Sequence, residues 1–406
     1  MSVELLQRFQ PQLRYDSNEA FFADSAAEWT DNPANVLRRE PGDEGPGEVI
    51  AAASPGPGQA QLDLDFLAAS SYADGQTVER TDVIGSVRRD YRDQYAALRA
   101  DRAYANRMYG RAKEDRGRLW LQYWFFYLYN DYNLAGGLGL HEGDWEMVQF
   151  RMGEGGDAPD LAVYAQHRWA EVAPWDEVEK PEGRPDTPVV YVGRGSHASY
   201  FHAGYHETEA WYDLADGKRS TPELALEAVG DREPSWVAWP GMWGDTRPRI
   251  PGLEQGSPTA PCRHGQWAHP AALLDQARTV ERGPAAPAPA VQASRGDGHL
   301  QLAYDFRGGP NVDRLVVTVN SEDDAIQPRT FTFVVDTAPS GTIDTSVELK
   351  PSQRYDVYVS AVDAEGRPTE SALTLIRPVG AKEPEPVPVL PWLGRVVYAI
   401  RRLFRS

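Results

Sequence analysis

The run from Leu119 to Asp131, which reads LWLQYWFFYLYND, constrains the fold of this chain more than any other segment. Large aromatic side chains suit a pleated, half-buried surface, so the run predicts a long β-strand. Ten residues later comes His141–Glu146, HEGDWE, and the GGLG sequence at 136–139 between the two predicts a tight turn. We therefore expect a strand that leads through a turn into a cluster of one imidazole and three carboxylates.

Other segments of the first 280 residues also have strand character. Trp145–Met152, Leu161–Gln166 and Pro188–Val192 carry the apolar residues typical of strands, and Gly- and Pro-rich turns separate them. The spacing of Tyr91, Tyr95 and Leu98 predicts a helix with one apolar stripe. The predicted fold is mainly β, with an N-terminal β-sandwich that carries helical insertions.

With 406 residues, the chain is too long for one ordinary core, and its composition divides it into several units. Pro- and Ala-rich stretches mark two stiff linkers. The predicted units are a β-sandwich over 1–280, a Pro/Ala linker over 281–290, a second small sandwich over 291–378, a Pro-rich linker over 379–390 and a basic amphipathic tail helix over 391–406.

The second sandwich resembles a fibronectin type III domain. The resemblance rests on Leu349–Ser371, in which Tyr355 takes the tyrosine-corner position of that fold. The sequence departs from the pattern at Tyr304, near where that family usually carries a core Trp. The resemblance implies a spacer or a protein-contact module and does not imply catalysis.

The acidic cluster predicts a metal site. If Trp145–Met152 is a strand, Asp144 and Glu146 project from the same face, with His141 arriving from the preceding turn and Glu142 free to point either way. Clustered carboxylates repel one another unless a cation lies among them. An imidazole with carboxylates suits Mg²⁺, Ca²⁺ or Mn²⁺ better than Zn²⁺. We predict His141, Asp144 and Glu146 as ligands of Mg²⁺ or Ca²⁺; the alternative is a turn whose acids cap backbone amides or pair with Arg.

Further polar residues follow predicted strands beside small residues. These are His167, Ser196 and His197, which we predict to contribute to binding. If the protein is an enzyme, His197 or Glu142 is the candidate for the proton-transfer role. Ser196 lacks the G-x-S-x-G context of an activated serine nucleophile. The alternative for each histidine is a structural, hydrogen-bonded role.

Several segments together resemble the vacuolar-protein-sorting 62 family over residues 5–275. They are Trp120–Asn130, His141–Glu146, Tyr164–His167, Val189–Phe201 and Trp239–Gly244, and they occur in that family's order. That family has no settled biochemical activity.

The His141–Glu146 segment is also distantly similar to the Gly-His-Arg-His-Asp-Trp-Glu motif of the necrosis-inducing microbial cytolysins. In that family a β-sandwich binds a divalent cation through the His, Asp and Glu of the motif and engages membrane sphingolipid. The resemblance implies the same ligand roles for His141, Asp144 and Glu146. Gly143 replaces the second motif histidine, and the paired cysteines and secretion signal of many such cytolysins are missing, so toxicity is not implied.

Charge and cysteine content exclude several classes of function. A net charge of −19 disfavours binding to nucleic acid, whose phosphates need a cationic partner. One cysteine permits neither an internal disulfide nor a zinc–thiolate site. The first residues contain no apolar segment after a basic start, so a cytoplasmic location is expected.

The tail contrasts with this acidic body. Residues 391–406 place apolar side chains at helical spacing, flanked by Arg residues. Such a helix can lie on an anionic membrane or dock on a partner protein, and it can equally fold back on the acidic body. The residues predicted to make the outward contact are Trp392, Arg395, Arg401, Arg402 and Arg405.

Together these patterns favour a non-catalytic, divalent-cation-dependent binding protein that recognises a polar head group of a lipid or glycan and can associate with a membrane. One alternative is a metal-dependent hydrolase of phosphodiester or ester substrates, in which the ion would activate a bound water. The other is a structural or cargo protein in which the cluster only stabilises the fold.

Overall fold

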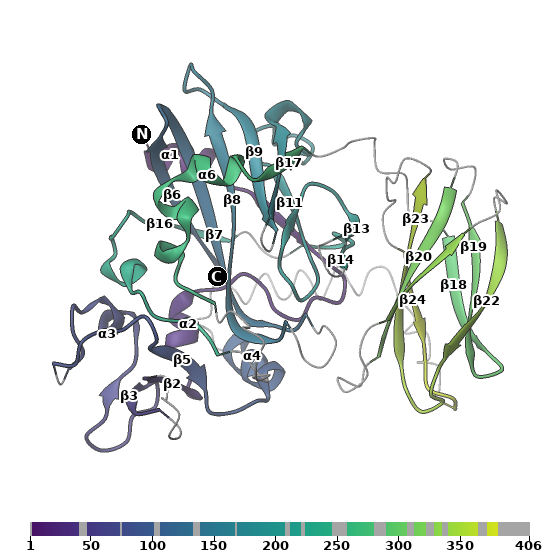
Figure 1. Ribbon diagram of the computed structural model, residues 1–406, viewed down its shortest axis with the longest axis horizontal. Helices are drawn as coiled ribbons and strands as arrows, with labels where there is room; N and C mark the ends of the chain where they lie inside the picture. The colour runs from purple at the N-terminus through teal and green to yellow at the C-terminus, as the bar shows by residue number, and fades with distance from the viewer. Residues whose placement is uncertain are drawn as a thin grey trace, which may run out of the picture.

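The computed structural model describes residues 2–39, 47–73, 75–100, 106–132, 139–166, 169–207, 212–220, 224–245, 258–279, 290–306, 312–321, 329–334, 340–363 and 372–380. Strand accounts for 46% of the structure and helix for 15%, so the protein is mainly β, as predicted. Its largest hydrophobic core draws on residues 6–273, and a separate core draws on residues 293–376 (Figure 1). The described chain thus forms two units, one around each of these cores.

A seven-stranded sheet forms the centre of the first unit, in the order β16-β6-β7-β8-β9-β10-β17. Consecutive strands from β6 to β10 pair antiparallel, and short β16 and β17 add parallel at the edges. The strands are β6 (Arg107–Asp115), β7 (Arg118–Asn130), β8 (His141–Met152), β9 (Pro159–Gln166), β10 (Trp169–Pro174), β16 (Ala225–Ala228) and β17 (Ala277–Thr279). The aromatic run is therefore a strand, β7, inside the sheet between β6 and β8.

Successive side chains of β7 point to opposite faces of the sheet, and both faces are covered. On one face Trp124 packs edge-to-face against Trp267, and Phe126 packs against Trp243. Trp243 and Trp267 therefore both pack on this face of the sheet, and α6 (Pro270–Leu274) lies across that face in Figure 1. On the other face Tyr127 stacks on His197.

A second sheet lies on the Tyr127 face, in the order β12-β11-β1-β15. The hydroxyl of Tyr164 on β9 donates to the Val189 carbonyl and joins the two sheets. The strands are β1 (Gln12–Tyr15), β11 (Val189–Val192), β12 (Ser199–Tyr200) and β15 (Arg219–Ser220), and a hairpin of β13 (Gly204–Glu207) and β14 (Tyr212–Ala215) follows β12 in the chain. Two packed layers of sheet are what a sandwich requires.

The segment 33–60, in which the sequence predicts only a loop or insertion, contains strands. They belong to a third sheet, in the order β4-β3-β2-β5. Its members are β2 (Asn35–Arg38), β3 (Val49–Ala52), β4 (Ala60–Gln61) and β5 (Val83–Ser86). These strands have only two to four residues and lie among Pro- and Gly-rich turns, so a short run such as Val49–Ala52 is hard to identify as a strand from sequence.

The helices are short. They are α1 (Ser2–Arg8), α2 (Ala26–Thr30), α3 (Leu64–Ala68), α4 (Tyr91–Arg99), α5 (Gly265–Ala268) and α6, with 3₁₀ turns η2 (Trp175–Glu177), η3 (Ser235–Ala238) and η4 (Pro261–Arg263). Helix α4 is the one predicted from the Tyr91 and Tyr95 stripe, and both tyrosines are buried. No helix in the described ranges is both long and apolar enough to cross a bilayer.

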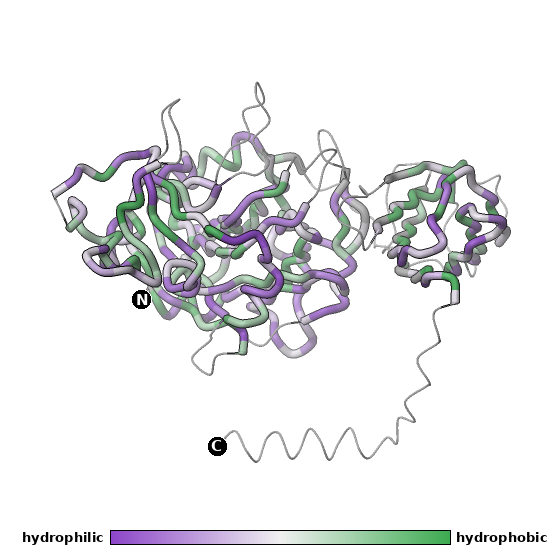
Figure 2. Tube along the Cα trace, turned by 90° about the horizontal axis from the view of Figure 1, so that it is seen from below, coloured by the Kyte–Doolittle hydropathy of each residue, from purple (hydrophilic) through white to green (hydrophobic). Residues whose placement is uncertain are grey.

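The second unit is a small sandwich of sheets β18-β19-β22 and β21-β20-β23-β24. Its strands are β18 (Ala290–Gly296), β19 (His299–Asp305), β20 (Val312–Ser321), β21 (Arg329–Val334), β22 (Ser340–Glu348), β23 (Tyr355–Asp363) and β24 (Ala372–Ile376). Hydrophobic and hydrophilic residues interleave along this unit, as they do in strands with one buried face (Figure 2).

The hydroxyl of Tyr355 accepts a hydrogen bond of 2.9 Å from the Lys350 backbone N–H, which is the contact that defines a tyrosine corner. Tyr304 is buried in the same core. The predicted tail contacts, Trp392, Arg395, Arg401, Arg402 and Arg405, lie outside the described residues, as does the whole of 391–406.

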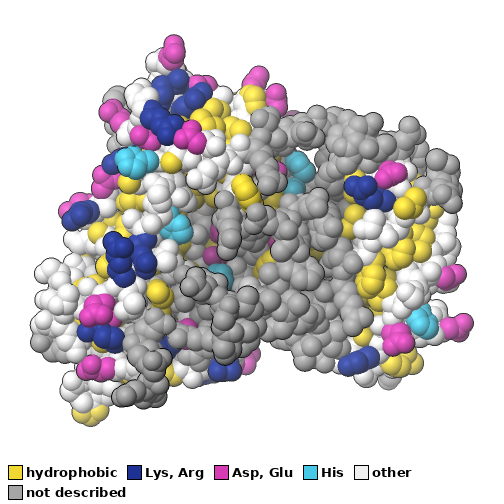
Figure 3. All heavy atoms as spheres, in the orientation of Figure 1, with side chains coloured by type: hydrophobic (Ala, Val, Ile, Leu, Met, Phe, Trp, Pro, Cys, Tyr) yellow, Lys and Arg dark blue, Asp and Glu magenta, His cyan; other side chains and the backbone are white. Residues whose placement is uncertain are grey.

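Much of the visible surface mixes basic and acidic side chains, which lie beside one another in Figure 3. Exposed ion pairs such as Arg151 with Asp160, at 2.8 Å, are of this kind. Pairs at the surface contribute little to stability. The charges that require explanation are therefore the buried ones.

Candidate functional site

Strand β8 begins at His141, four residues before the predicted start of the strand at Trp145, so His141 lies on the strand itself. Its first residues pair with the end of β7, with His141 opposite Asn130 and Asp144 opposite Tyr127. Inside this strand Gly143 has a φ of +60°, and a Cβ atom there would lie 2.2 Å from the Trp243 carbonyl oxygen. Only glycine fits such a position.

The irregularity at Gly143 brings together two of the three predicted ligands. In a regular strand, His141 and Asp144 would point to opposite faces. Here His141 Nε2 lies 4.0 Å from Asp144 Oδ1. Both side chains are only slightly exposed, at 17% and 9%. A separation of 4.0 Å lies within the span of two ligands on one ion when each bond is about 2.0–2.6 Å long.

Hydrogen bonds fix the tautomer of His141. Its Nδ1 lies 2.7 Å from the Gly143 carbonyl oxygen, which can only accept, so Nδ1 carries the proton. Its Nε2 lies 3.0 Å from Nδ2 of Asn130. The Asn130 amide is oriented by the Tyr132 N–H, which donates to Oδ1. The lone pair of His141 therefore resides on Nε2, the nitrogen nearer Asp144, and a second ring nitrogen bonded to a carbonyl is usual in metal-binding histidines.

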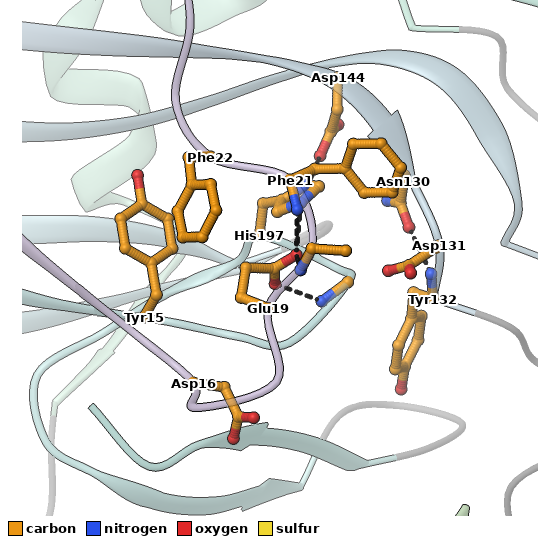
Figure 4. Close-up of polar contacts among 12 residues, drawn as sticks. Tyr15, Asp16, Glu19, Phe21, Phe22, Asn130, Asp131, Tyr132, Asp144 and His197 are labelled. Carbon is orange, nitrogen blue, oxygen red and sulfur yellow. Dashed lines mark hydrogen bonds and ion pairs between the residues drawn. The ribbon is translucent and has the colours of Figure 1, made fainter. Parts of the chain in front are cut away.

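The second oxygen of Asp144 is held by His197, a residue predicted to contribute to binding. His197 Nδ1 lies 2.9 Å from Asp144 Oδ2, and His197 Nε2 lies 3.7 Å from Glu19 Oε1. The imidazole is fully buried and stacks parallel on Tyr127, with ring centroids 3.9 Å apart. Figure 4 shows the His197 ring between Glu19 and Asp144.

This arrangement makes His197 a buried cation. Burial alone would lower its pKa, but the hydrogen bond to Asp144 and the pairing with Glu19 outweigh it and raise the pKa to about 10. Burial opposes the charged form of Glu19 as well, yet its pairing with His197 lowers the pKa of that carboxyl. His197 thus lies between the carboxyl groups of Glu19 and Asp144, and both contacts favour its charged form.

Glu19 is held by three backbone amides and was not predicted from the sequence. Its Oε1 accepts from the N–H groups of Ala20 and Phe21, and its Oε2 accepts from the Gly195 N–H at 2.8 Å. The backbone of Gly195 lies so close to Asp131 that a Cβ atom added to Gly195 would be 2.5 Å from Asp131 Oδ1. The only sequence signal was the mixture of acidic and aromatic residues near the N-terminus, which did not single out Glu19.

Glu142, the other candidate for proton transfer, belongs to a different set of contacts. Its carboxylate is fully buried and accepts from the Tyr91 hydroxyl at 2.7 Å and from the Ser86 N–H at 3.1 Å. Tyr91 also stacks on Tyr129 at 4.0 Å. Glu142 thus anchors α4 and β5 to the start of β8.

Asp131, also missed by the sequence analysis, lies at the end of β7. Burial and the charge of Glu19 raise its pKa, while Arg92 acts against them through an ion pair of 3.1 Å. Arg92 is on α4, so this pair ties the helix to the rim of the site. Neither residue carries a motif that would have identified it.

The remaining predicted residues divide into three cases. Ser196 is buried, and within the described part of the chain its Oγ has no hydrogen-bond partner. His167 lies outside the described residues. Glu146 is partly buried and lies opposite Phe125, while Asp144 lies opposite Tyr127, so the two carboxylates project from the same face of β8, as predicted.

The described residues contain no group of three His, Cys, Asp or Glu side chains arranged to hold an ion. The predicted trio is thus represented by a close pair, His141 and Asp144, with Glu146 further along the strand. The donor set of that pair fits a hard divalent cation: one oriented imidazole lone pair and one fixed carboxylate oxygen.

Comparison with solved structures finds distant similarity to a toxin fold and to fibronectin-type domains. A structure described as a toxin fold for microbial attack and plant defence aligns at 13% identity and a TM-score of 0.33, over 68% of this chain and 89% of that chain. Necrosis and ethylene inducing protein 2, from the causal agent of cocoa's witches' broom disease, aligns at 13% identity and 0.28, over 57% and 78%. A fibronectin-like protein from Clostridium thermocellum aligns at 22% identity and 0.18, over 24% and 100%.

No family model matches the chain, and no curated protein matches it. The resemblance to the vacuolar-protein-sorting 62 family therefore stays a prediction from the motifs.

Proposed function

We propose that this protein is a non-catalytic, divalent-cation-dependent binding protein that recognises a polar head group of a lipid or glycan. The observation that carries the proposal is the pairing of His141 and Asp144 at the start of β8. The His141 lone pair is fixed on Nε2, and Asp144 Oδ1 lies 4.0 Å from it. We propose His141 and Asp144 as ligands of Mg²⁺ or Ca²⁺, with Glu146 as the third.

A site with few protein ligands supports a role in presenting the ion to a second molecule. Mg²⁺ is commonly bound through one or two carboxylates and keeps several coordination positions for water or for oxygens of the bound compound. The positions that His141 and Asp144 do not fill would take hydroxyl, phosphate or carbonyl oxygens of a head group. The bound ion would supply the positive charge that attracts such oxygens to this acidic chain.

The contacts of His197 and Glu142 support binding over hydrolysis. A general base must reach the proton that it removes. His197 is fully buried and held in its charged form by two carboxylates, and Glu142 is fully buried in hydrogen bonds to Tyr91 and Ser86. In this conformation neither can meet a substrate, so the protein is proposed to bind without turnover.

Metal analysis with point variants tests the proposal. We expect the dialysed protein to bind Mg²⁺ or Ca²⁺ in isothermal titration calorimetry, and His141→Ala or Asp144→Asn to weaken that binding at least about tenfold. His269→Ala is the matched control, because its side chain is 74% exposed and far from these contacts in sequence. Equal affinity in the wild type and His141→Ala would refute the assignment of the site.

Ligand class is tested with two probes. Vesicles containing phosphatidylserine and an array of immobilised glycans are each incubated with the protein in Mg²⁺ and in EDTA. The proposal is supported if the protein is retained on one of the two probes only in Mg²⁺ and the Asp144→Asn variant is not retained. The probe that retains the protein then identifies the ligand as a lipid or a glycan. Retention that is unaffected by EDTA or by the substitution contradicts it.

The tail is proposed to add a peripheral contact with an anionic membrane on the cytoplasmic side. Its Arg residues contrast with the overall charge of −19, and clusters of this kind bind anionic lipid. A chain that ends at residue 390 should float less with anionic vesicles than the full chain in a flotation assay. Equal flotation would leave a partner protein or the acidic body as the tail's contact.

A further inference from the structure

We propose that His197 and Glu19 are positioning residues that hold Asp144 in the orientation required for cation binding, an inference that rests on the proposed function. The two residues do not contact the ion in this scheme. They fix one oxygen of Asp144 so that the other faces His141.

Three segments far apart in the sequence meet at this contact. Asp144 comes from β8, His197 from the turn that follows β11, and Glu19 from the segment that follows β1. Each carboxylate approaches a different ring nitrogen, at 2.9 Å and 3.7 Å. The imidazole cannot rotate without breaking one of these contacts or leaving the face of Tyr127.

The backbone at His197 is strained in a way that the contacts compensate. Its φ is +56°, in the left-handed region that few residues other than Gly adopt. Such a conformation is unfavourable for a residue with a Cβ atom and persists only where the surroundings determine it. Here the ring is fully buried between Tyr127 and the two carboxylates. The fold retains a strained turn and thereby places an N–H donor at Asp144.

The consequence concerns the freedom of the carboxylate. The terminal torsion of an aspartate is broad, so an unheld carboxylate samples many orientations. With Oδ2 bonded to His197, Oδ1 stays directed toward His141, and a cation need not reorder the group when it binds. Outer residues that orient a ligand in this manner typically contribute 10–100-fold to metal affinity.

The test uses substitutions at His197 in the full chain, with Mg²⁺ affinity measured by calorimetry and thermal unfolding measured in EDTA. His197→Ala should weaken Mg²⁺ binding about 10–100-fold, because Asp144 loses its donor. His197→Asn should restore most of the affinity, because Asn tolerates the left-handed backbone and keeps a side-chain N–H. A purely structural role predicts instead that unfolding temperature changes while affinity does not.

A matched control is available in a second buried histidine. His206 is 6% exposed and stacks on Tyr200 at 3.7 Å, as His197 stacks on Tyr127, but no contact links it to Asp144. His206→Ala should lower stability and leave Mg²⁺ affinity unchanged. If His197→Ala does not fold, Glu19→Gln serves in its place, since it retains the side-chain volume and removes the charge behind the imidazole.

The outcomes separate this inference from the proposed function. Wild-type protein that shows no Mg²⁺ or Ca²⁺ binding at all overturns both. Binding that is lost in His141→Ala but unchanged in folded His197→Ala or Glu19→Gln overturns the positioning role alone. Weakened binding in His197→Ala with recovery in His197→Asn supports both.

Discussion

His197 Nδ1 and Asp144 Oδ2 lie 2.9 Å apart, although 53 positions separate the two residues in the chain. This contact joins the turn after β11 to β8 and places a buried positive charge beside the HEGDWE segment. It also means that only one oxygen of Asp144 is available to a ligand. The predictions below concern that oxygen, the backbone that presents it and the charges buried nearby.

Asn130→Asp should strengthen cation binding. The Asn130 amide nitrogen lies 3.0 Å from His141 Nε2, so it occupies the side of the ring from which an ion would bind. A carboxylate in its place would supply an anionic oxygen, and we expect Mg²⁺ affinity to rise about tenfold. The increase in unfolding temperature that Mg²⁺ causes should grow accordingly.

The control for added charge is Gln59→Glu, at an exposed position. It changes net charge by the same amount without an oxygen near His141. Calorimetry should show unchanged affinity for this variant. An Asn130→Asp protein that binds Mg²⁺ no better than Gln59→Glu would exclude Asn130 from the neighbourhood of the ion.

Gly143→Ala should destabilise the N-terminal unit severely. The new Cβ would lie 2.2 Å from the Trp243 carbonyl oxygen on a backbone with φ of +60°. Both the left-handed strain and the steric clash oppose it, so the free energy of unfolding should fall by more than about 2 kcal/mol. Gly117→Ala separates the two causes, because Gly117 has φ of +72° and open space around it.

Urea unfolding of the two alanine variants measures this difference. The free energy of unfolding of Gly117→Ala should fall by only about 1 kcal/mol, because only the strain of the left-handed conformation acts there. Similar decreases in the free energy of unfolding of the two variants would show that the strand adapts around position 143.

The stability of the fold should depend on pH through Asp16. Burial, together with the charge of Asp216, raises the pKa of Asp16 to about 7, whereas an unfolded Asp titrates at about 3.9. Between these values the folded state holds a proton that the unfolded state has lost. This carboxyl therefore reduces the free energy of unfolding progressively as pH rises from about 4 to about 7.

Asp16→Asn cannot ionise, so its stability relative to wild type should increase over that range, by on the order of 2–4 kcal/mol. Urea unfolding of both proteins at pH 5 and pH 8, at one ionic strength, measures the change. Asp157→Asn, at an exposed position, should differ from wild type in free energy of unfolding by the same amount at both pH values. If Asp16→Asn also differs from wild type by the same amount at both pH values, Asp16 is charged in the folded protein throughout this range.

Tyr355→Phe should weaken the second sandwich. The hydroxyl of Tyr355 accepts from the Lys350 N–H at 2.9 Å, and its loss should cost about 1 kcal/mol. The amide of Lys350 should then exchange its hydrogen faster in native-state exchange measured by mass spectrometry. Tyr304→Phe is the comparison, because Tyr304 lies in the same core and the described structure gives its hydroxyl no hydrogen bond. Equal exchange in the two variants would remove the tyrosine corner as a stabilising contact.

The sequence predicted the elements whose signal is local. The aromatic run marks β7, the Tyr91 and Tyr95 spacing marks α4, and the tyrosine-corner pattern marks the contact of Tyr355. Each depends on a repeat or motif within a few residues. The strands of segment 33–60 were missed because each has only two to four residues and lies among Pro- and Gly-rich turns.

Contacts between distant segments could not be predicted in the same way. His197 was identified as a candidate, but its burial and charge depend on Glu19, which has no motif and lies at the other end of the N-terminal unit. From the sequence, Gly143 was identified only as the residue that replaces the second motif histidine. Its role inside a strand is set by the Trp243 carbonyl, a contact made only in the folded protein.

The covering of β7 from both sides has a consequence for biosynthesis. Gln122 on that strand donates to the Gln266 carbonyl, across 144 positions of the chain. A ribosome will therefore have exposed the most aromatic stretch of the protein well before it makes the residues that shield one of its surfaces. During that interval the nascent chain exposes an uncharged, apolar segment of high β-propensity. We expect this segment to be prone to self-association unless a chaperone binds it.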